Sequence, residues 1–208
     1  MVRKASRGKL VRRGPQRESY DRVLIACVGE RTETQYFQEL RDAWGISTAN
    51  VVIVPSNLDP MGLVKLARKK RREERKNGED YDRVYCVFDH DDQAHFESAS
   101  QAAEADEFRL ARSWPCFEFW FLLHFEYTRQ PFGRSGGKSK CDNCISALKR
   151  HLPGYAKHGK DRFRELEERL GDAMNRADRA LTDAQSTEEC NPSTEVHELV
   201  RYLKSIKS

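Results

Sequence analysis

Residues 81–92 read YDRVYCVFDHDD, and this stretch decides the fold class. The run from Val84 to Phe88 is almost entirely apolar and β-favouring, and it stops abruptly at Asp89. A continuous apolar run of this length, bounded by charge, is typical of a strand covered on both faces in a parallel sheet. Asp89 and Asp91 are two residues apart at the carboxyl end of this strand, so in extended geometry both carboxylates point to the same side.

These aspartates make the end of the strand a candidate metal site. Open α/β sheets bind their ligands in the crevice outside the carboxyl ends of the strands. Two carboxylates there repel each other unless a cation lies between them, and such oxygen ligands favour Mg²⁺ or Mn²⁺. The residues allow a second interpretation, in which Asp89, Asp91 and Asp92 form a solvated acidic loop that caps the next helix.

The segments before this strand alternate between strand and helix patterns. In chain order they are a strand at 22–29, a helix with a buried stripe of Tyr36, Phe37, Leu40 and Trp44, a strand at 50–55 and a basic helix at 61–76. A β-α-β-α-β order predicts a parallel sheet with right-handed crossovers. We therefore expect an α/β, Rossmann-like fold: a mostly parallel central sheet flanked by helices, with a helical C-terminal extension.

The segments after it continue the pattern and then become helical. They are a helix at 95–107, a strand at 108–113, a buried helix at 115–125, and helices at 141–151, 162–185 and from about 195 onward. The closing helix carries Ser193 or Thr194 as its cap and buries Val196, Leu199, Val200, Leu203 and Ile206. The helix at 162–185 has only a thin apolar stripe of Phe163, Leu166, Leu170, Met174 and Leu181, so we expect an arm that faces a partner or substrate.

Three glutamates are further candidates for the site. Glu30 and Glu33 lie where the first strand hands over to the first helix, and there they could face the same crevice as Asp89. The alternative is that they favour the positive end of the helix, which Thr32 or Thr34 would cap. Glu118 lies within the apolar segment WPCFEFWFLLHFE, where a carboxylate needs either a structural partner or an active-site role.

Composition limits the class of protein. The chain has 208 residues, 38% hydrophobic and 34% charged, which is enough for one core with polar helices around it. No apolar run approaches the roughly 20 residues that span a bilayer, and the basic N-terminus has no signal-peptide core, so we expect a cytoplasmic protein. The six cysteines are interpreted as small buried residues, although Cys141-x-x-Cys144 has one arm of zinc spacing.

Basic residues cluster in three places, although the net charge is only +4. They are an N-terminal arm, expected to be disordered, the helix at 61–76, and a glycine-rich loop at 130–140. Positive charge beside an acidic site fits a polyanionic substrate, and a solvated helix face is the alternative. The candidate nucleic-acid-binding residues are Lys69, Arg72, Arg134, Lys138 and Lys140.

Four blocks taken together resemble the RloB-like family of small Toprim-fold proteins from bacterial phage-defence and restriction-linked loci. The blocks are ACVGERTETQYF (26–37), VFDHDD (87–92), PCFEFWFLLHFE (115–126) and NPSTEVHELV (191–200), in the family's order. The resemblance covers about Arg22 to Leu203. The basic arm at 1–21 lies outside it. We expect a Toprim-like catalytic core at 22–128, and a glycine-rich loop with a C-terminal helical region, packed on that core, at 129–208.

The resemblance also implies a set of site residues. Asp89 and Asp91 would be metal ligands and catalytic residues, with Asp92 supporting, and Glu30 and Glu33 would match the acidic residues of the family's E-G-E-x-T-E block. Glu30 would serve as a ligand. Glu118, singled out by its apolar surroundings and not by the resemblance, is the candidate supporting residue. The chain departs from the pattern at Val28, where the family has a glutamate before the glycine. Glu30 would share a strand face with residue 28 and could replace the missing carboxylate.

The function implied by the resemblance is a Mg²⁺- or Mn²⁺-dependent nuclease that cleaves RNA, tRNA included, or DNA as an anti-phage effector. An ABC- or AAA-type ATPase encoded nearby is the implied partner. The alternative is a regulatory module that binds a metal or nucleotide and has lost catalysis at Val28. A phosphatase with an Asp-x-Asp nucleophile is a third class, but that motif usually follows the first strand of the domain, not the third.

Overall fold

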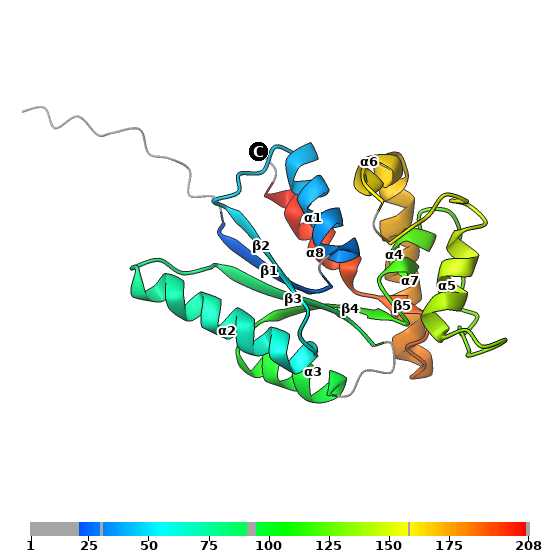
Figure 1. Cartoon of the computed structure of the whole chain (residues 1–208), viewed down its shortest axis with the longest axis horizontal. Helices are drawn as coiled ribbons and strands as arrows, with labels where there is room; N and C mark the ends of the chain where they lie inside the picture. The colour runs from blue at the N-terminus through cyan, green and yellow to red at the C-terminus, as the bar shows by residue number, and fades with distance from the viewer. Residues whose placement is uncertain (1–20, 30, 91–94, 158, 207–208) are drawn as a thin grey trace, which may run out of the picture.

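The structure is a computed structural model, and it describes residues 21–29, 31–90, 95–157 and 159–206. Its sheet has the strand order β2-β1-β3-β4-β5 (Figure 1). The strands are β1 (Val23–Val28), β2 (Val51–Ser56), β3 (Arg83–Asp89), β4 (Arg109–Trp114) and β5 (Ser193–Thr194). The first four are parallel, and β5 runs antiparallel to β4. The predicted α/β fold with a mostly parallel sheet is therefore confirmed.

Helices cover both faces of this sheet. The helices α1 (Thr32–Ala43) and α8 (Val196–Ser205) lie on one face, and α2 (Pro60–Lys76) and α3 (Phe96–Ala105) lie on the other (Figure 1). Successive residues of a strand point to opposite faces, so each central strand contributes to two apolar clusters. Ile25 and Val87 belong to the cluster under α1, whereas Leu24 and Phe88 belong to the cluster under α2.

A group of helices lies beside the sheet. Its members are α4 (Glu118–Leu122), α5 (Lys140–Leu148), α6 (Arg162–Leu166), a 3₁₀ turn at Glu167–Arg169, and α7 (Leu170–Thr187) (Figure 1). The segment that becomes α4 leaves β4 directly, so the group meets the edge where the parallel strands end. Trp120 of α4 and Ala177 of α7 belong to the same buried cluster as Ile25 of β1. That cluster therefore includes residues from both sides of the predicted boundary at 128/129.

The structure corrects the interpretation of residues 162–185 as an arm. This segment is broken into α6, the 3₁₀ turn and α7, and its inner side is buried. Phe163 and Leu166 are fully buried, and four alanines of α7 are buried with them: Ala173, Ala177, Ala180 and Ala184. The apolar stripe expected from the sequence was too narrow because it included only large side chains and left out these alanines. Small residues let a helix approach its neighbours closely, so this helix belongs to the core.

The predicted helix caps are also corrected. Neither Thr32 nor Thr34 caps α1, because the cap position is Arg31 and no side chain there accepts a hydrogen bond. The Thr34 hydroxyl instead donates to the Gly29 carbonyl at 2.9 Å. Ser193 and Thr194 form β5, although the Thr194 hydroxyl accepts a bond of 3.2 Å from the Val196 N–H.

The buried helix expected at 115–125 is shorter, with α4 at Glu118–Leu122. The buried face of α8 is confirmed at Val196, Leu199, Val200 and Leu203, and Ile206 is partly buried against the same cluster.

Several other predictions can be placed. Five cysteines are buried and Cys190 is exposed, and none of the six forms a disulfide. Within the described ranges, every helix is too short or too polar to cross a lipid bilayer. Residues 1–20 of the predicted arm, together with Glu30, Asp91 and Asp92, lie outside the described residues.

Candidate acidic site at the carboxyl edge of the sheet

The site forms where β1 and β3 end side by side. These strands are neighbours in the sheet, with Cys27 paired to Val87, so both finish at the same edge. The chain moves outward from β1 to β2 and then returns past β1 to β3, which makes this edge the point where the strand order reverses. Ligands of open α/β sheets bind at such points. Asp89 is the last residue of β3, and Glu33 lies in the first turn of α1.

Gly29 allows Glu33 to turn back toward the sheet. Its backbone has a φ of +106°, in a region that residues with a side chain rarely adopt. A β-carbon at position 29 would lie 2.4 Å from Oε2 of Glu33, so the carboxylate occupies the space above this glycine. The hydrogen bond from Thr34 to the Gly29 carbonyl holds the same turn. Glu33 is therefore both a first-turn glutamate and a residue of the crevice.

Asp89 lies next to Glu33 in an environment that disfavours its charge. Its Oδ1 atom is buried, and no described residue donates a hydrogen bond to it. Burial raises the pKa of Asp89 well above its usual range, and the charges of Glu33 and Glu118 raise it further. The Phe117 backbone N–H and the Lys157 ammonium act in the opposite direction.

Glu118 joins the same group from α4. Only 2% of this residue is exposed. Its Oε1 accepts a hydrogen bond of 2.9 Å from the Tyr155 hydroxyl and lies 3.9 Å from the Lys157 ammonium nitrogen. Its Oε2 accepts a contact of 3.8 Å from the Cys141 thiol. The sequence left two alternatives for Glu118, a structural partner or a role in the site. The structure shows a structural partner, Tyr155, and it also places Glu118 close to Asp89 and Glu33.

Sequence reasoning missed Tyr155 and Lys157. The Lys157 carbonyl accepts a hydrogen bond of 3.0 Å from the Thr32 hydroxyl, which fixes the lysine beside the start of α1. The ammonium group of Lys157 then acts on the carboxyl groups of Glu33, Asp89 and Glu118. Burial lowers the pKa of Lys157, but the charge of Glu118 outweighs this effect and raises it. No motif marks these residues, since both lie in an irregular segment after Gly154.

The pKa of Glu33 allows its carboxyl group to exchange a proton near neutral pH. Burial raises the pKa of Glu33 to about 7, and the negative charge of Glu118 adds to the effect. Its own backbone N–H and Lys157 oppose the shift. A carboxyl group with such a pKa can accept or release a proton near neutral pH.

The oxygen atoms at this edge fit a hard divalent cation. Asp89 Oδ1 has no hydrogen-bond donor among the described residues, and Glu33 and Asp89 repel each other. A cation between them would remove both penalties, and carboxylate oxygens are the ligands that Mg²⁺ and Mn²⁺ prefer. A second group lies close by: Cys116, Glu118 and Cys141 place their donor atoms within 4.8 Å of one another and could hold a metal ion.

Val28 does not face the same way as Asp89. It packs against the apolar cluster under α2 and α3. Tyr85, Val87 and Asp89 lie on the same face of β3, because alternate residues of a strand share a face. Tyr85 and Val87 belong to the apolar cluster on the opposite side of the sheet from Val28. The regular strand ends at Val28, and the positive φ of Gly29 breaks the alternation, so the predicted equivalence of positions 28 and 30 cannot rest on strand geometry.

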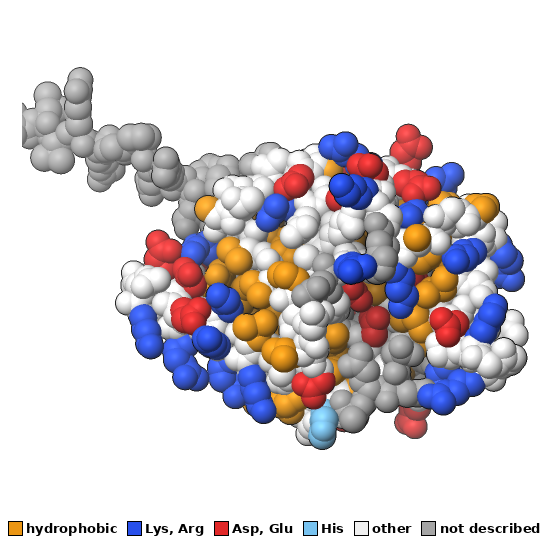
Figure 2. All heavy atoms as spheres, viewed as in Figure 1, with side chains coloured by type: hydrophobic (Ala, Val, Ile, Leu, Met, Phe, Trp, Pro, Cys, Tyr) orange, Lys and Arg blue, Asp and Glu red, His pale blue; other side chains and the backbone are white. Residues whose placement is uncertain are grey.

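The basic residues of α2 lie away from the acidic site. This helix starts near the carboxyl edge and returns to the opposite edge, where β3 begins (Figure 1). Figure 2 shows its lysines and arginines along the outer surface. Much of their charge is neutralised locally, because Lys69 lies 3.9 Å from Glu73, Arg68 pairs with Asp106, and Asp80 accepts from two arginines. Arg72 lines a shallow cavity between α2 and α3.

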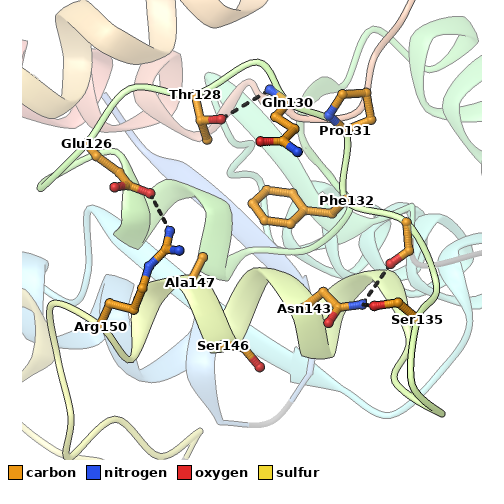
Figure 3. Close-up of a pocket in the computed structure, with 11 residues that line it drawn as sticks. Glu126, Thr128, Gln130, Pro131, Phe132, Ser135, Asn143, Ser146, Ala147 and Arg150 are labelled. Atoms are coloured by element: carbon orange, nitrogen blue, oxygen red, sulfur yellow. Dashed lines mark hydrogen bonds and ion pairs between the residues drawn. The ribbon is translucent and has the colours of Figure 1, made fainter.

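The glycine-rich loop lies against α5. Lys138 donates a hydrogen bond of 3.0 Å to the Ser146 hydroxyl, and Lys140 is the first residue of α5. A cavity of about 390 Å³ lies between this loop and the helix, with Phe132, Asn143 and Arg150 among its lining residues (Figure 3). Arg134 belongs to the same loop. The loop is therefore folded onto the helical group that carries Glu118.

One comparison with known proteins gives a match. The family model for RloB-like proteins matches residues 23–203, which is most of the chain. No curated protein and no solved structure matches significantly.

Proposed function

The chain belongs to the RloB-like family, and we propose that it is a Toprim-type, metal-dependent nuclease that cleaves RNA, tRNA included, or DNA in anti-phage defence. The observation that carries this proposal is the meeting of Glu33 and Asp89 at the point where the strand order reverses. Two repelling carboxylates with the Lys157 ammonium close by fit a site that binds a cation and a phosphate together.

In this proposal Asp89, together with Glu30, Asp91 and Asp92, would hold Mg²⁺ or Mn²⁺, and Glu33 would lie beside the ion. The ion, when bound, supplies positive charge to the scissile phosphate and lowers the pKa of the attacking water. Glu33 would accept or release the proton of the reaction; its pKa is about 7 without an ion, and a bound ion would lower it.

The cationic residues bind the substrate. Lys157 lies beside the carboxylates, so its ammonium group can stabilise negative charge that develops on the phosphate. The loop residues Arg134, Lys138 and Lys140 precede or begin α5, in the helical group that carries Glu118, and in this proposal they would contact the substrate backbone. Lys69 and Arg72 lie on α2 and would contact a more distant part of a long substrate.

The test is cleavage of tRNA, mRNA and DNA by purified protein with Mg²⁺ or Mn²⁺, with and without the proposed ATPase partner. We expect products from at least one substrate, and we expect Asp89→Ala to abolish them while the protein stays folded. Asp172→Ala is the matched control, because Asp172 is exposed in the first turn of α7. Absence of cleavage under all of these conditions would contradict the proposal.

The second candidate is a metal- or nucleotide-binding module without catalysis, working with an ATPase. Val28 favours it, because this apolar residue stands where the family has a glutamate and packs away from Asp89. Cleavage assays on Val28→Glu beside the unaltered protein separate the two. Activity in the unaltered protein supports the nuclease, and activity only in the variant supports the binding module.

A further inference from the structure

A cluster of thiols lies beside Glu118 and belongs to neither the crevice carboxylates nor the basic surfaces. Cys116 precedes α4, and Cys141 and Cys144 lie three residues apart on one side of α5. All three are buried. The Cys141 and Cys144 thiols both lie close enough to the Cys116 thiol to affect its pKa. If these cysteines served only as small apolar core residues, a carboxylate would not be expected among them. The Glu118 carboxylate nevertheless contacts the Cys141 sulfur.

We propose that Cys116, Cys141 and Glu118 bind a zinc ion, with the Cys144 thiol beside Cys116 available as the fourth ligand. Thiolates are soft donors and, together with a carboxylate, they select Zn²⁺ over Mg²⁺. The thiols lose their protons to solvent as the ion binds, so the site holds two or three thiolates and one carboxylate. This site has a different donor set from the proposed magnesium site, which uses oxygen donors from β3 and α1, although Glu118 lies close to both.

The spacing of the donor atoms fits a tetrahedral zinc ion. Zn–S bonds of about 2.3 Å and Zn–O bonds of about 2.1 Å place sulfur and oxygen ligands roughly 3.6 Å apart. The distance from the Cys141 Sγ to the Glu118 Oε2 is 3.8 Å. The donor atoms of Cys116, Glu118 and Cys141 all lie within 4.8 Å of one another. Small side-chain movements therefore bring three ligands to bonding distance.

The surroundings of Glu118 resemble those of a metal ligand. Its Oε1 is held by the Tyr155 hydroxyl, which leaves Oε2 directed at the cysteines. Hydrogen bonds of this kind fix the orientation of ligating carboxylates. Two thiolates and a carboxylate around Zn²⁺ leave one negative charge, and Lys157 lies 3.9 Å from both Glu118 Oε1 and Cys141 Sγ to offset it.

A zinc ion here would join two elements that pack side by side. The ligands come from the start of α4 and from α5, so the ion would cross-link them. The glycine-rich loop lies directly before α5 and would be held with it. Removal of zinc should therefore loosen α5 and the loop before the sheet unfolds, which hydrogen exchange of the 133–152 segment can detect.

The experiment measures zinc content of the purified full chain and the absorption spectrum after anaerobic exchange of zinc for Co²⁺. We expect about one zinc per chain and the thiolate-to-cobalt charge-transfer bands of a tetrahedral site. Cys116→Ser and Cys141→Ser should lose both. Two cysteine controls should keep them: Cys86→Ala, buried in the cluster under α2, and Cys190→Ser, which is exposed.

Other outcomes have definite meanings. Absence of zinc and of cobalt–thiolate bands in the unaltered chain overturns the proposal, even if the cysteine variants fail to fold. Bands that persist in Cys116→Ser and Cys141→Ser overturn it as well. Asp89→Asn should keep the zinc and the bands while it loses cleavage, so failure of the zinc site and failure of the proposed nuclease are separate results.

Discussion

The carboxylate of Glu33 occupies the space that a side chain on Gly29 would need, since a β-carbon there would lie 2.4 Å from Oε2. This contact ties the conformation of the β1–α1 turn to the position of a candidate site residue. The glycine is required twice, once for its φ of +106° and once for the room above it. The first turn of α1 can therefore direct Glu33 toward Asp89.

Gly29→Ala should damage the site more than an ordinary glycine substitution. We expect a loss of about 1–3 kcal/mol in the free energy of unfolding from backbone strain, and a displaced Glu33 with loss of cleavage. Gly45→Ala is the matched control, because Gly45 also has a positive φ of +67° but no atom within 4 Å of the added carbon. Urea unfolding and cleavage assays measure both. Equal loss of activity in the two variants would contradict the geometric argument.

Asp89→Asn should separate stability from function. The amide keeps the shape of the side chain and the hydrogen bond from the Phe117 N–H, but it removes a buried charge that Glu33 and Glu118 repel. Without added metal we therefore expect an unchanged or higher melting temperature. The affinity for Mn²⁺, measured by calorimetry, should fall at least tenfold. A large fall in melting temperature would show that the ionised carboxylate is a structural element.

The strand and helix pattern was readable because the central strands carry strong local signals. Val84 to Phe88 form an unbroken apolar run, and only a strand buried on both faces needs one. The same reasoning put Asp89 at the end of its strand. Glu33 was predicted to face the same crevice, and its place there follows from the order of β1 and β3 in the sheet. Local sequence patterns therefore predicted the strands and helices, and the order of the strands in the sheet placed Glu33 close to Asp89.

The remaining parts of the site depend on contacts that no local pattern encodes. Thr32 and Lys157 are separated by 125 positions, and their hydrogen bond brings a cation to the carboxylates. Tyr155 and Cys141 reach Glu118 from segments that the sequence shows only as a loop and a helix. Such pairings depend on how the helical group docks against the sheet, which periodicity alone does not determine.

The alanines of α7 test why the sequence interpretation of that helix was wrong. Ala177 is fully buried against the main cluster. Ala177→Leu should overpack this contact and reduce the free energy of unfolding by about 1–3 kcal/mol. Asn175→Leu is the control, since residue 175 is exposed on the same helix and should change stability by less than about 0.5 kcal/mol. Urea unfolding of both variants provides the measurement, and equal effects would mean that α7 is not part of the core.

His124 should make the protein sensitive to acid. It is 1% exposed, and its Nδ1 lies 2.9 Å from the Trp120 carbonyl oxygen, to which the neutral ring donates. Burial lowers its pKa from 6.5 to about 4, so the unfolded chain binds a proton more readily than the folded one. The stabilisation is complete above pH 6.5 and is lost as the pH falls toward 4. Between pH 6.5 and 5 the loss should be about 2 kcal/mol.

His124→Gln isolates this effect. The glutamine amide can donate to the Trp120 carbonyl, as the ring does, but it does not titrate in this range. Urea unfolding at pH 7, 6 and 5 should show stability that falls more steeply in the unaltered protein than in the variant, with the two curves converging as the pH drops. Parallel curves would mean that the pKa of His124 is the same in the folded and unfolded states, which would contradict the effect of its burial.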